Sequence, residues 1–224
     1  MIENNFNKKG HTEVLTLELG NLLTNLQNKI YSYTKNLIVD HTGINDISKI
    51  IKLPFKRIPS ESEWSEMMRD INDSKELKEL INSESIKQVF NKIFKNPKLF
   101  KISTFRARYP SQNRAVYNWH QDEGTWYLSK NKQVTNKLPA TLWLSVNGAS
   151  KKESIQLLQF SHKNKLLEHV WVDGQGFFKA KTKIYKEKSD LIFNPDLKQS
   201  QAIIFHPLTL HRSSPLSDNK NLRP

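Results

Sequence analysis

The feature that most constrains the fold is a change of pattern near residue 98, where helical spacing gives way to strand-like alternation. In the first part of the chain, apolar residues recur at three- and four-residue intervals, as on the buried face of a helix. This spacing predicts helices over about 14–33, 77–81 and 86–94. Ser60, with Glu63 three residues later, has capping-box spacing and predicts the start of a further helix.

After this change, segments rich in aromatic and β-branched residues alternate with a period of two, as strands do. They span 100–109, 117–126, 141–146, 155–160, 170–172, 191–193, 202–205 and 209–213. Strands this numerous, without helical stretches between them, indicate a mostly antiparallel sandwich or barrel. We therefore expect one α+β domain over 1–224, in which residues 1–98 form a helical cover on one face and 99–224 form the sheet-rich core.

Composition excludes several classes of function. The chain has 224 residues and no cysteine, which rules out disulfide scaffolds, zinc fingers, iron–sulfur clusters and thiol nucleophiles. Any metal must be held by nitrogen and oxygen. The apolar runs are far shorter than the ~18 residues that cross a bilayer, and the first residues lack the apolar run of a secretory signal. We expect a cytoplasmic protein that makes no contact with a membrane.

The formal net charge of +13 is concentrated in the second part of the chain, where residues 99–224 carry 20 Lys and Arg against 9 Asp and Glu. Such a field attracts anions, although lysines scattered among Asn and Ser are also typical of a solvated surface. There is no zinc-finger spacing, RNA-binding strand signature or basic helix, so nucleic acid is not favoured. A small-molecule substrate, with an anionic group as one option, is the expected partner.

The most informative stretch is 117–126, in which His120 and Asp122 are two residues apart. In an extended strand, residues with this spacing project to the same face, so an imidazole and a carboxylate would reach one point. These donors suit a first-row divalent ion, and a second histidine would complete the ligand set of non-haem Fe(II) oxygenases. A remote histidine is therefore required.

Four histidines lie downstream, and we select His211 because it ends the alternating run that follows the apolar strand 202–205. His162 lies in a polar loop sequence and is expected to be exposed. His169 and His206 flank strands, where a hydrogen-bonded structural histidine is the commoner outcome.

Three segments together resemble the phytanoyl-CoA dioxygenase-like family of Fe(II)/2-oxoglutarate-dependent dioxygenases, of which ectoine hydroxylase is a relative. They are His120-Gln121-Asp122 with Thr125-Trp126, then Leu158-Gln159-Phe160-Ser161-His162-Lys163, and finally His211-Arg212-Ser213 followed by Arg223. The resemblance implies a double-stranded β-helix, a cupin-like jelly roll, with iron at its open end. The chain departs from the family pattern at Phe160 and within 198–201, where the family commonly has glycine.

The resemblance implies that His120, Asp122 and His211 bind Fe(II). Three coordination positions would remain, enough for a bidentate 2-oxo acid and O2. Because related halogenases lack the carboxylate so that chloride can bind iron, the presence of Asp122 favours hydroxylation over halogenation.

The resemblance also implies that Arg223 pairs with the distal carboxylate of 2-oxoglutarate. A guanidinium can grip a carboxylate through two parallel hydrogen bonds, and the turn-rich segment 213–219 can return the chain to place it there. Ser213 is expected to add a hydrogen bond to the same carboxylate. Trp126 is expected to pack over 2-oxoglutarate or the substrate, with a place in the core as the alternative.

The substrate is the least determined part. Arg106 and Arg108 precede the proposed ligands and suit an anionic group, although an exposed basic strand edge is an equal alternative. Gln121 and Thr125, beside Asp122, are the further candidates for substrate contact.

Two rival functions account for part of the pattern. A non-catalytic β-sandwich module that binds carbohydrate or polyanion explains the charge and the aromatic strands, but it leaves the ordered histidines and carboxylate to coincidence. A cupin-like metal protein with a different chemistry keeps the metal ligands and gives Arg223 no role.

Overall fold

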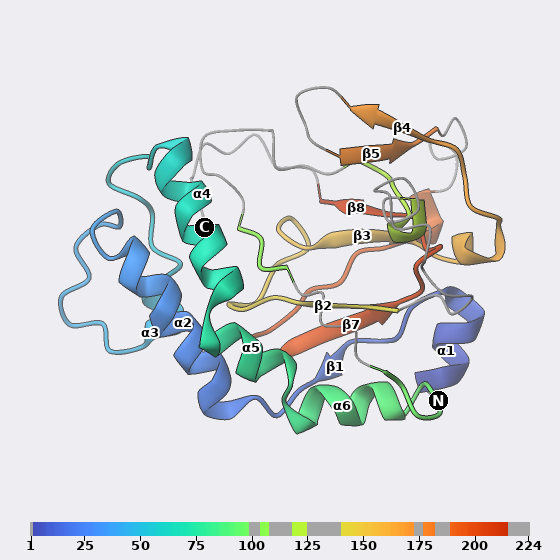
Figure 1. Ribbon diagram of the computed structural model, residues 1–224, viewed down its shortest axis with the longest axis horizontal. Helices are drawn as coiled ribbons and strands as arrows, with labels where there is room; N and C mark the ends of the chain where they lie inside the picture. Colours follow the sequence, from blue (N-terminus) through green and yellow to red (C-terminus); the bar gives the residue numbers. More distant parts are fainter. Residues whose placement is uncertain are drawn as a thin grey trace. The chain divides into compact units, whose positions relative to one another are not determined.

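The computed structural model describes residues 2–98, 104–107, 118–124, 140–172, 177–181 and 189–214. They form a mixed helix-and-sheet protein (Figure 1), and the chain divides into two compact units. A sheet-rich unit contains the described residues among 2–16, 92–94 and 118–214. A helical unit contains 17–91, 95–98 and 104–107. Residues 2–16, placed by the sequence in the helical cover, thus belong to the sheet-rich unit.

The helical unit is built from amphipathic helices whose apolar sides are buried. They are α2 (Gly20–Thr34), α3 (Ile47–Ile50), α4 (Glu61–Asp73), α5 (Lys75–Ile81) and α6 (Glu84–Asn91). The capping box predicted before α4 is confirmed, since the Ser60 hydroxyl accepts from the Glu63 amide at 3.1 Å and the Glu63 carboxylate accepts from the Ser60 amide at 2.7 Å. Both bonds satisfy amide groups that a helix start leaves without partners.

The helix predicted over 14–33 begins only at Gly20. Leu15–Thr16 instead form the short strand β1, because this part of the apolar run also alternates with a period of two and finds a strand partner in β7. Two helices were not predicted, α3 and the N-terminal α1 (Ile2–Lys9). None of the helices within the described residues is long and apolar enough to cross a bilayer.

One short segment after the helices is tied to α4. Asn72 accepts from the Phe105 amide at 2.6 Å and donates to the Phe105 carbonyl at 3.0 Å. Residues 104–107, the described part of the strand expected over 100–109, are therefore not in a strand but are held by side-chain contacts.

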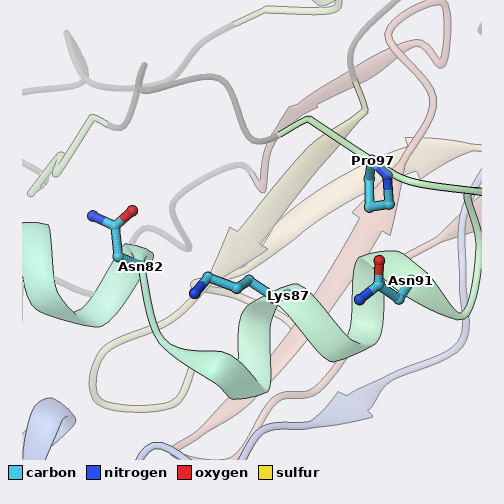
Figure 2. Close-up of a pocket in the computed structure, with 4 residues that line it drawn as sticks. All are labelled: Asn82, Lys87, Asn91 and Pro97. Atoms are coloured by element: carbon cyan, nitrogen blue, oxygen red, sulfur yellow. The ribbon is translucent and has the colours of Figure 1, made fainter.

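A pocket of about 340 Å3 lies in the helical unit, between the end of α5 and the residues after α6 (Figure 2). Its lining consists of Asn82, Lys87, Asn91 and Pro97. Its described lining, three uncharged residues and one lysine, offers neither the imidazoles nor the carboxylates that suit a first-row transition metal.

The sheet-rich unit consists of antiparallel strands arranged in two three-stranded sheets and a hairpin. Figure 1 labels β4 and β5 of the hairpin beside each other. The first sheet has the order β1-β7-β2, with β7 (Gln201–Phe205) central and β2 (Thr141–Leu144) at one edge. The second has the order β6-β3-β8, formed by Ile192–Phe193, Ile155–Leu158 and His211–Ser213. The hairpin pairs β4 (His169–Val172) with β5 (Phe177–Ala180).

The two three-stranded sheets share one core. Ile203 and Phe205 of β7 pack in the same buried cluster as Ile155 and Leu157 of β3, together with Leu197. The alternation along each strand sends these side chains to one face. Each such fully buried side chain contributes about 1.5–3 kcal/mol, so this cluster aligns the strands that carry the site.

Several strand predictions are confirmed in position, and others are wrong. The strands over 141–146, 155–160, 170–172, 191–193, 202–205 and 209–213 are found as β2, β3, β4, β6, β7 and β8, most of them shorter. β5 was not predicted. Residues 118–124, the described part of the strand expected over 117–126, contain an isolated bridge at His120 and a helical turn over 122–124.

Candidate metal centre

Two histidines from distant parts of the sequence lie directly opposite each other. The His120 amide donates to the His211 carbonyl, and the His211 amide donates to the His120 carbonyl, both at 3.0 Å. The two residues thus form a hydrogen-bonded antiparallel pair, in which side chains project to the same face. The imidazole rings lie 4.1 Å apart between centroids. This pair brings the predicted ligands together by backbone hydrogen bonds.

In both rings, Nδ1 lies against the backbone carbonyl two residues earlier in the chain. His120 Nδ1 lies 2.7 Å from the Asn118 carbonyl, and His211 Nδ1 lies 3.0 Å from the Thr209 carbonyl. A carbonyl only accepts, so in each ring Nδ1 carries the hydrogen and donates it. The lone pair that remains on Nε2 is the one that can bind a metal.

Asp122 completes the group from the start of the helical turn over 122–124. Its Oδ1 lies 3.4 Å from His211 Nε2 and 3.9 Å from His120 Nε2. Its Oδ2 accepts a hydrogen bond of 2.5 Å from the Thr141 hydroxyl on β2. The sequence analysis expected His120 and Asp122 to share one face of an extended strand. That explanation is wrong, because a bridge followed by a helical turn brings the two side chains together.

The electrostatics of the group favour an ionised carboxylate. Burial raises the pKa of Asp122, but the charge and hydrogen bond of His211, with His120 and Thr141, outweigh it and lower the pKa to about 2. Burial and the neighbouring His211 lower the pKa of His120 to about 3, so its ring is neutral at pH 7. Burial also lowers the pKa of His211, but the Asp122 carboxylate outweighs it and the net shift is upward.

These three residues fit a divalent metal by their chemistry and their spacing. The ligand atoms of His120, Asp122 and His211 all lie within 4.8 Å of one another. Two imidazoles and one carboxylate are the donors that suit non-haem Fe(II) and leave coordination positions open. Among the described residues, this is the one group of three or more such side chains able to hold a metal ion.

Other histidines make structural hydrogen bonds. His162 Nε2 lies 3.0 Å from the Asn7 carbonyl. His206 Nδ1 accepts from the Leu208 amide at 3.1 Å. His169 Nε2 accepts from the Gln121 amide at 3.0 Å. Their contacts agree with the structural roles expected for His169 and His206, while His162 is more engaged than an exposed loop residue would be.

The residues predicted to bind 2-oxoglutarate or substrate differ in where the structure places them. Ser213 lies on β8 two positions after His211, hence on the same face of the strand. Gln121 is fully buried, with its side-chain amide donating to the Leu208 carbonyl at 2.9 Å and accepting from the Leu167 amide at 2.8 Å. Arg106 is exposed and belongs to the helical unit. Thr125, Trp126, Arg108 and Arg223 lie outside the described residues, and their roles stay predictions.

Thr141 was missed by the sequence analysis, although its hydroxyl contacts the Asp122 carboxylate. The segment over 141–146 was identified only as a strand. No local pattern links a threonine to a carboxylate 19 residues earlier, and the first position of a strand carries no chemical signature. Only the three-dimensional arrangement reveals this contact.

Comparison with known proteins gives a family and a fold. The sequence model described as phytanoyl-CoA dioxygenase (PhyH) matches residues 56–222. No curated protein sequence matches the chain.

Several solved structures resemble the chain at low sequence identity. The apo form of the non-haem monooxygenase ThoJ has a TM-score of 0.57 and 13% identity, covering 100% of this chain and 74% of that one. AviO1 from Streptomyces viridochromogenes Tue57 has a TM-score of 0.52 and 14% identity, covering 96% and 86%. EvdO2 from Micromonospora carbonacea var. aurantiaca, complexed with 2-oxoglutarate, has a TM-score of 0.51 and 12% identity, covering 96% and 83%. At these identities the likeness concerns the fold.

Proposed function

The chain belongs to the phytanoyl-CoA dioxygenase family of non-haem iron, 2-oxoglutarate-dependent oxygenases, and from this membership we propose that it hydroxylates a small polar or anionic metabolite. The observation that carries the proposal is the convergence of His120, Asp122 and His211 within 4.8 Å. In the proposed reaction, 2-oxoglutarate, O2 and a substrate C–H bond give succinate, CO2 and a C–OH group. One oxygen atom of O2 enters succinate and the other enters the product.

Each residue of the group has a defined part in the proposal. His120 and His211 present neutral Nε2 atoms once the proton on His211 has left, and Asp122 presents Oδ1 while Thr141 holds Oδ2. Iron bound there supplies the site at which 2-oxoglutarate and O2 react. The carboxylate of Asp122 occupies a position that a halide would need, and we therefore propose hydroxylation as the outcome, with no halogenation.

We assign 2-oxoglutarate to the side of the centre that β8 borders. Ser213 follows His211 on the same face of β8 and would donate a hydrogen bond to the distal carboxylate. Arg223 would pair with that carboxylate and Trp126 would pack over 2-oxoglutarate or the substrate, as the family resemblance implies. The structure of EvdO2 holds 2-oxoglutarate, which supports this co-substrate for the present chain.

The proposal includes a jelly-roll arrangement of the sheet-rich unit. It is supported by two antiparallel sheets that share a core cluster and by the structural likeness to ThoJ. An anionic substrate group is supported by the excess of 20 basic over 9 acidic residues within 99–224. Arg106, Arg108 and Thr125 remain the proposed substrate contacts, whereas the Gln121 side chain is fully buried and bonded at both ends within the protein, so it would support the ligands instead. The cytoplasmic location expected from the sequence stays a prediction.

The experiment that tests the function has two stages. Anaerobic addition of Fe(II) and 2-oxoglutarate should produce a weak visible charge-transfer band, as expected for this family's chelate. Succinate formation is then measured with amino acids, sugar phosphates, nucleotides and acyl thioesters as substrates. A band together with substrate-dependent succinate supports the proposal, whereas neither signal in a folded, iron-supplied protein would overturn it in favour of a binding module.

The Asp122→Ala variant separates the metal centre from non-specific iron chemistry. Removing the carboxylate should abolish succinate formation while the protein stays folded. Asp196→Ala is the matched control, because Asp196 is an exposed carboxylate of the same unit and its replacement should leave turnover unchanged. Turnover retained in Asp122→Ala would remove Asp122 from the ligand set.

A further inference from the structure

We propose that His169 is a positioning residue for the metal centre, which holds the backbone of Gln121 in the orientation that aims both His120 and Asp122. The inference rests on the proposed function, because it concerns the same three ligands. Gln121 is the single residue between two of them, so the orientation of its peptide groups sets the directions of both neighbouring side chains.

Both nitrogens of the His169 ring are engaged in ways that fix its orientation. Nδ1 lies 2.8 Å from the Leu167 carbonyl, to which it must donate, and Nε2 accepts from the Gln121 amide at 3.0 Å. Burial lowers the pKa of His169, which agrees with a neutral ring that accepts at Nε2. The ring therefore works as a rigid connector between two backbone segments.

A second pair of bonds closes this connection. The Gln121 side-chain oxygen accepts from the Leu167 amide at 2.8 Å, so Leu167 and Gln121 are joined both directly and through His169. The other end of the Gln121 amide donates to the Leu208 carbonyl at 2.9 Å. Leu208 lies three residues before His211. The segment with two ligands is thus tied to the segment that leads to the third.

The β4–β5 hairpin supports the same segment at two further points. The Ala180 amide of β5 donates to the Trp119 carbonyl at 2.9 Å, while His169, its partner across the hairpin, holds Gln121. Gly124 is buried against the ring, and a Cβ at this position would overlap the His169 imidazole. The chain therefore leaves space at Gly124 that the His169 ring fills.

A positioning role follows from what a metal centre demands. Ligands must be held within ~0.5 Å of their productive positions by supporting groups. Removing such outer partners typically weakens metal binding by about 10–100-fold. Loss of the Nε2 acceptor leaves the Gln121 amide without its partner inside the protein, so that peptide would rotate to find another. His120 and Asp122 would then be aimed less accurately.

The test uses Co(II) as the probe metal and the full chain. His169→Ala should weaken Co(II) binding by about tenfold or more and should accelerate hydrogen exchange at the Gln121 amide in the metal-free protein, measured by NMR. His169→Gln, whose side-chain oxygen can reach the position of Nε2, should recover part of both. Gly124→Ala should weaken Co(II) binding as well, by displacing the ring.

Val170→Ala is the matched control, because it truncates the next residue of β4 and removes no side-chain hydrogen bond. It should lower thermal stability while leaving the Co(II) dissociation constant and the Gln121 amide unchanged. Wild-type affinity and exchange in a folded His169→Ala protein would overturn the inference, as would equal weakening by Val170→Ala. Failure of the wild type to bind Co(II) would instead contradict the proposed function, and the amide exchange would still decide the role of His169 in holding Gln121.

Discussion

Arg212 lies over the indole ring of Trp119, with the guanidinium carbon 4.7 Å from the ring centroid. Trp119 precedes His120 and Arg212 follows His211, so this contact joins the same two segments as the histidine pair. Side chains alternate along paired strands, which places the stack on the face away from the imidazoles. The Arg212 Nε also donates to the Gln156 side chain at 2.7 Å. The two ligand segments are therefore held together both by the backbone hydrogen bonds of His120 with His211 and by this stacked pair.

Replacing Arg212 should weaken this reinforcement. Arg212→Ala removes a cation–π contact and a charge-assisted hydrogen bond, and we expect the free energy of unfolding to fall by roughly 1–3 kcal/mol. Arg212→Lys keeps the charge without the planar fork, and it should recover only part of the loss. Urea unfolding curves measure both. Equal stability of all three proteins would contradict a role for the stack.

Thr141 should tune the metal site through the carboxylate. Thr141→Val keeps the shape of the side chain but removes the donor to Asp122 Oδ2, and we expect Co(II) affinity to fall by about tenfold. Thr141→Ser keeps the hydroxyl and should stay close to the wild type. Calorimetric titration gives both dissociation constants. A Val variant with unchanged affinity would show that Oδ2 needs no fixed partner.

The grouping of His120, Asp122 and His211 was predictable from residue types, but the backbone that brings them together was not. A histidine and an aspartate two residues apart suggested a ligand pair, and the two side chains do lie close together in the structure. The stated reason, an extended strand, is wrong, because a spacing of two is equally compatible with a bridge at His120 and a helical turn at Asp122. Short spacings restrict the distance between side chains more strongly than they specify the backbone between them.

Other parts of the fold could not be predicted from the sequence because they depend on contacts with distant residues. The apolar run before α2 alternates with both helical and strand periods, and only the presence of β7 as a partner decides that Leu15–Thr16 form a strand. Ser60 and Glu63, by contrast, interact with each other, so their helix start could be predicted locally. Features that depend on distant partners, such as His169 against Gln121, have no signal in the neighbouring sequence.

Two departures from the family pattern fall on strained backbone. Phe160 has φ 66° and Ser200, within the departing segment 198–201, has φ 63°. Both values lie in the left-handed region, where glycine has no steric penalty and other residues lose about 1–2 kcal/mol. The glycines that the family resemblance implies at these two places would suit this backbone, which the chain adopts with larger residues.

Ser200→Gly should stabilise the protein. Relief of the left-handed strain outweighs the additional freedom of glycine in the unfolded chain, and we expect a gain of up to about 1 kcal/mol. Ser200→Val should be destabilising, because a β-branched residue tolerates positive φ worst. Thermal melting ranks the three proteins. A Gly variant that melts below the wild type would contradict this account.

His206 should make the free energy of unfolding depend on pH. Burial and the neighbouring His162 lower the pKa of His206 to about 4, whereas the unfolded value is about 6.5. Between these values the unfolded chain binds more protons, so the free energy of unfolding should fall as pH decreases from about 6.5 towards 4. His206→Asn retains an acceptor for the Leu208 amide and should flatten this slope. Urea midpoints at pH 7.5 and pH 5 would show it, and an unchanged slope would exclude His206 as a contributor.

Metal binding should displace a proton from the centre. In the metal-free protein, the charge and hydrogen bond of Asp122 raise the pKa of His211 above its ordinary value. The His211 ring therefore holds a proton that must leave when a metal binds. Below the His211 pKa, the apparent Co(II) affinity should rise about tenfold per pH unit, and above it the affinity should level off. Because the shift is upward, the levelling should occur above pH 6.5.

Calorimetry in two buffers with different ionisation enthalpies measures the proton directly, and we expect about one proton released per Co(II) at pH 6. Asp122→Asn is the control: without the carboxylate, only the hydrogen bond to the Thr209 carbonyl opposes the larger effect of burial, so the pKa of His211 should fall. The weakened Co(II) binding that remains should then vary less between pH 6 and 7. An affinity that is flat over that range in the wild type would mean that His211 is already neutral, and the ion pair with Asp122 would then not form before metal binding.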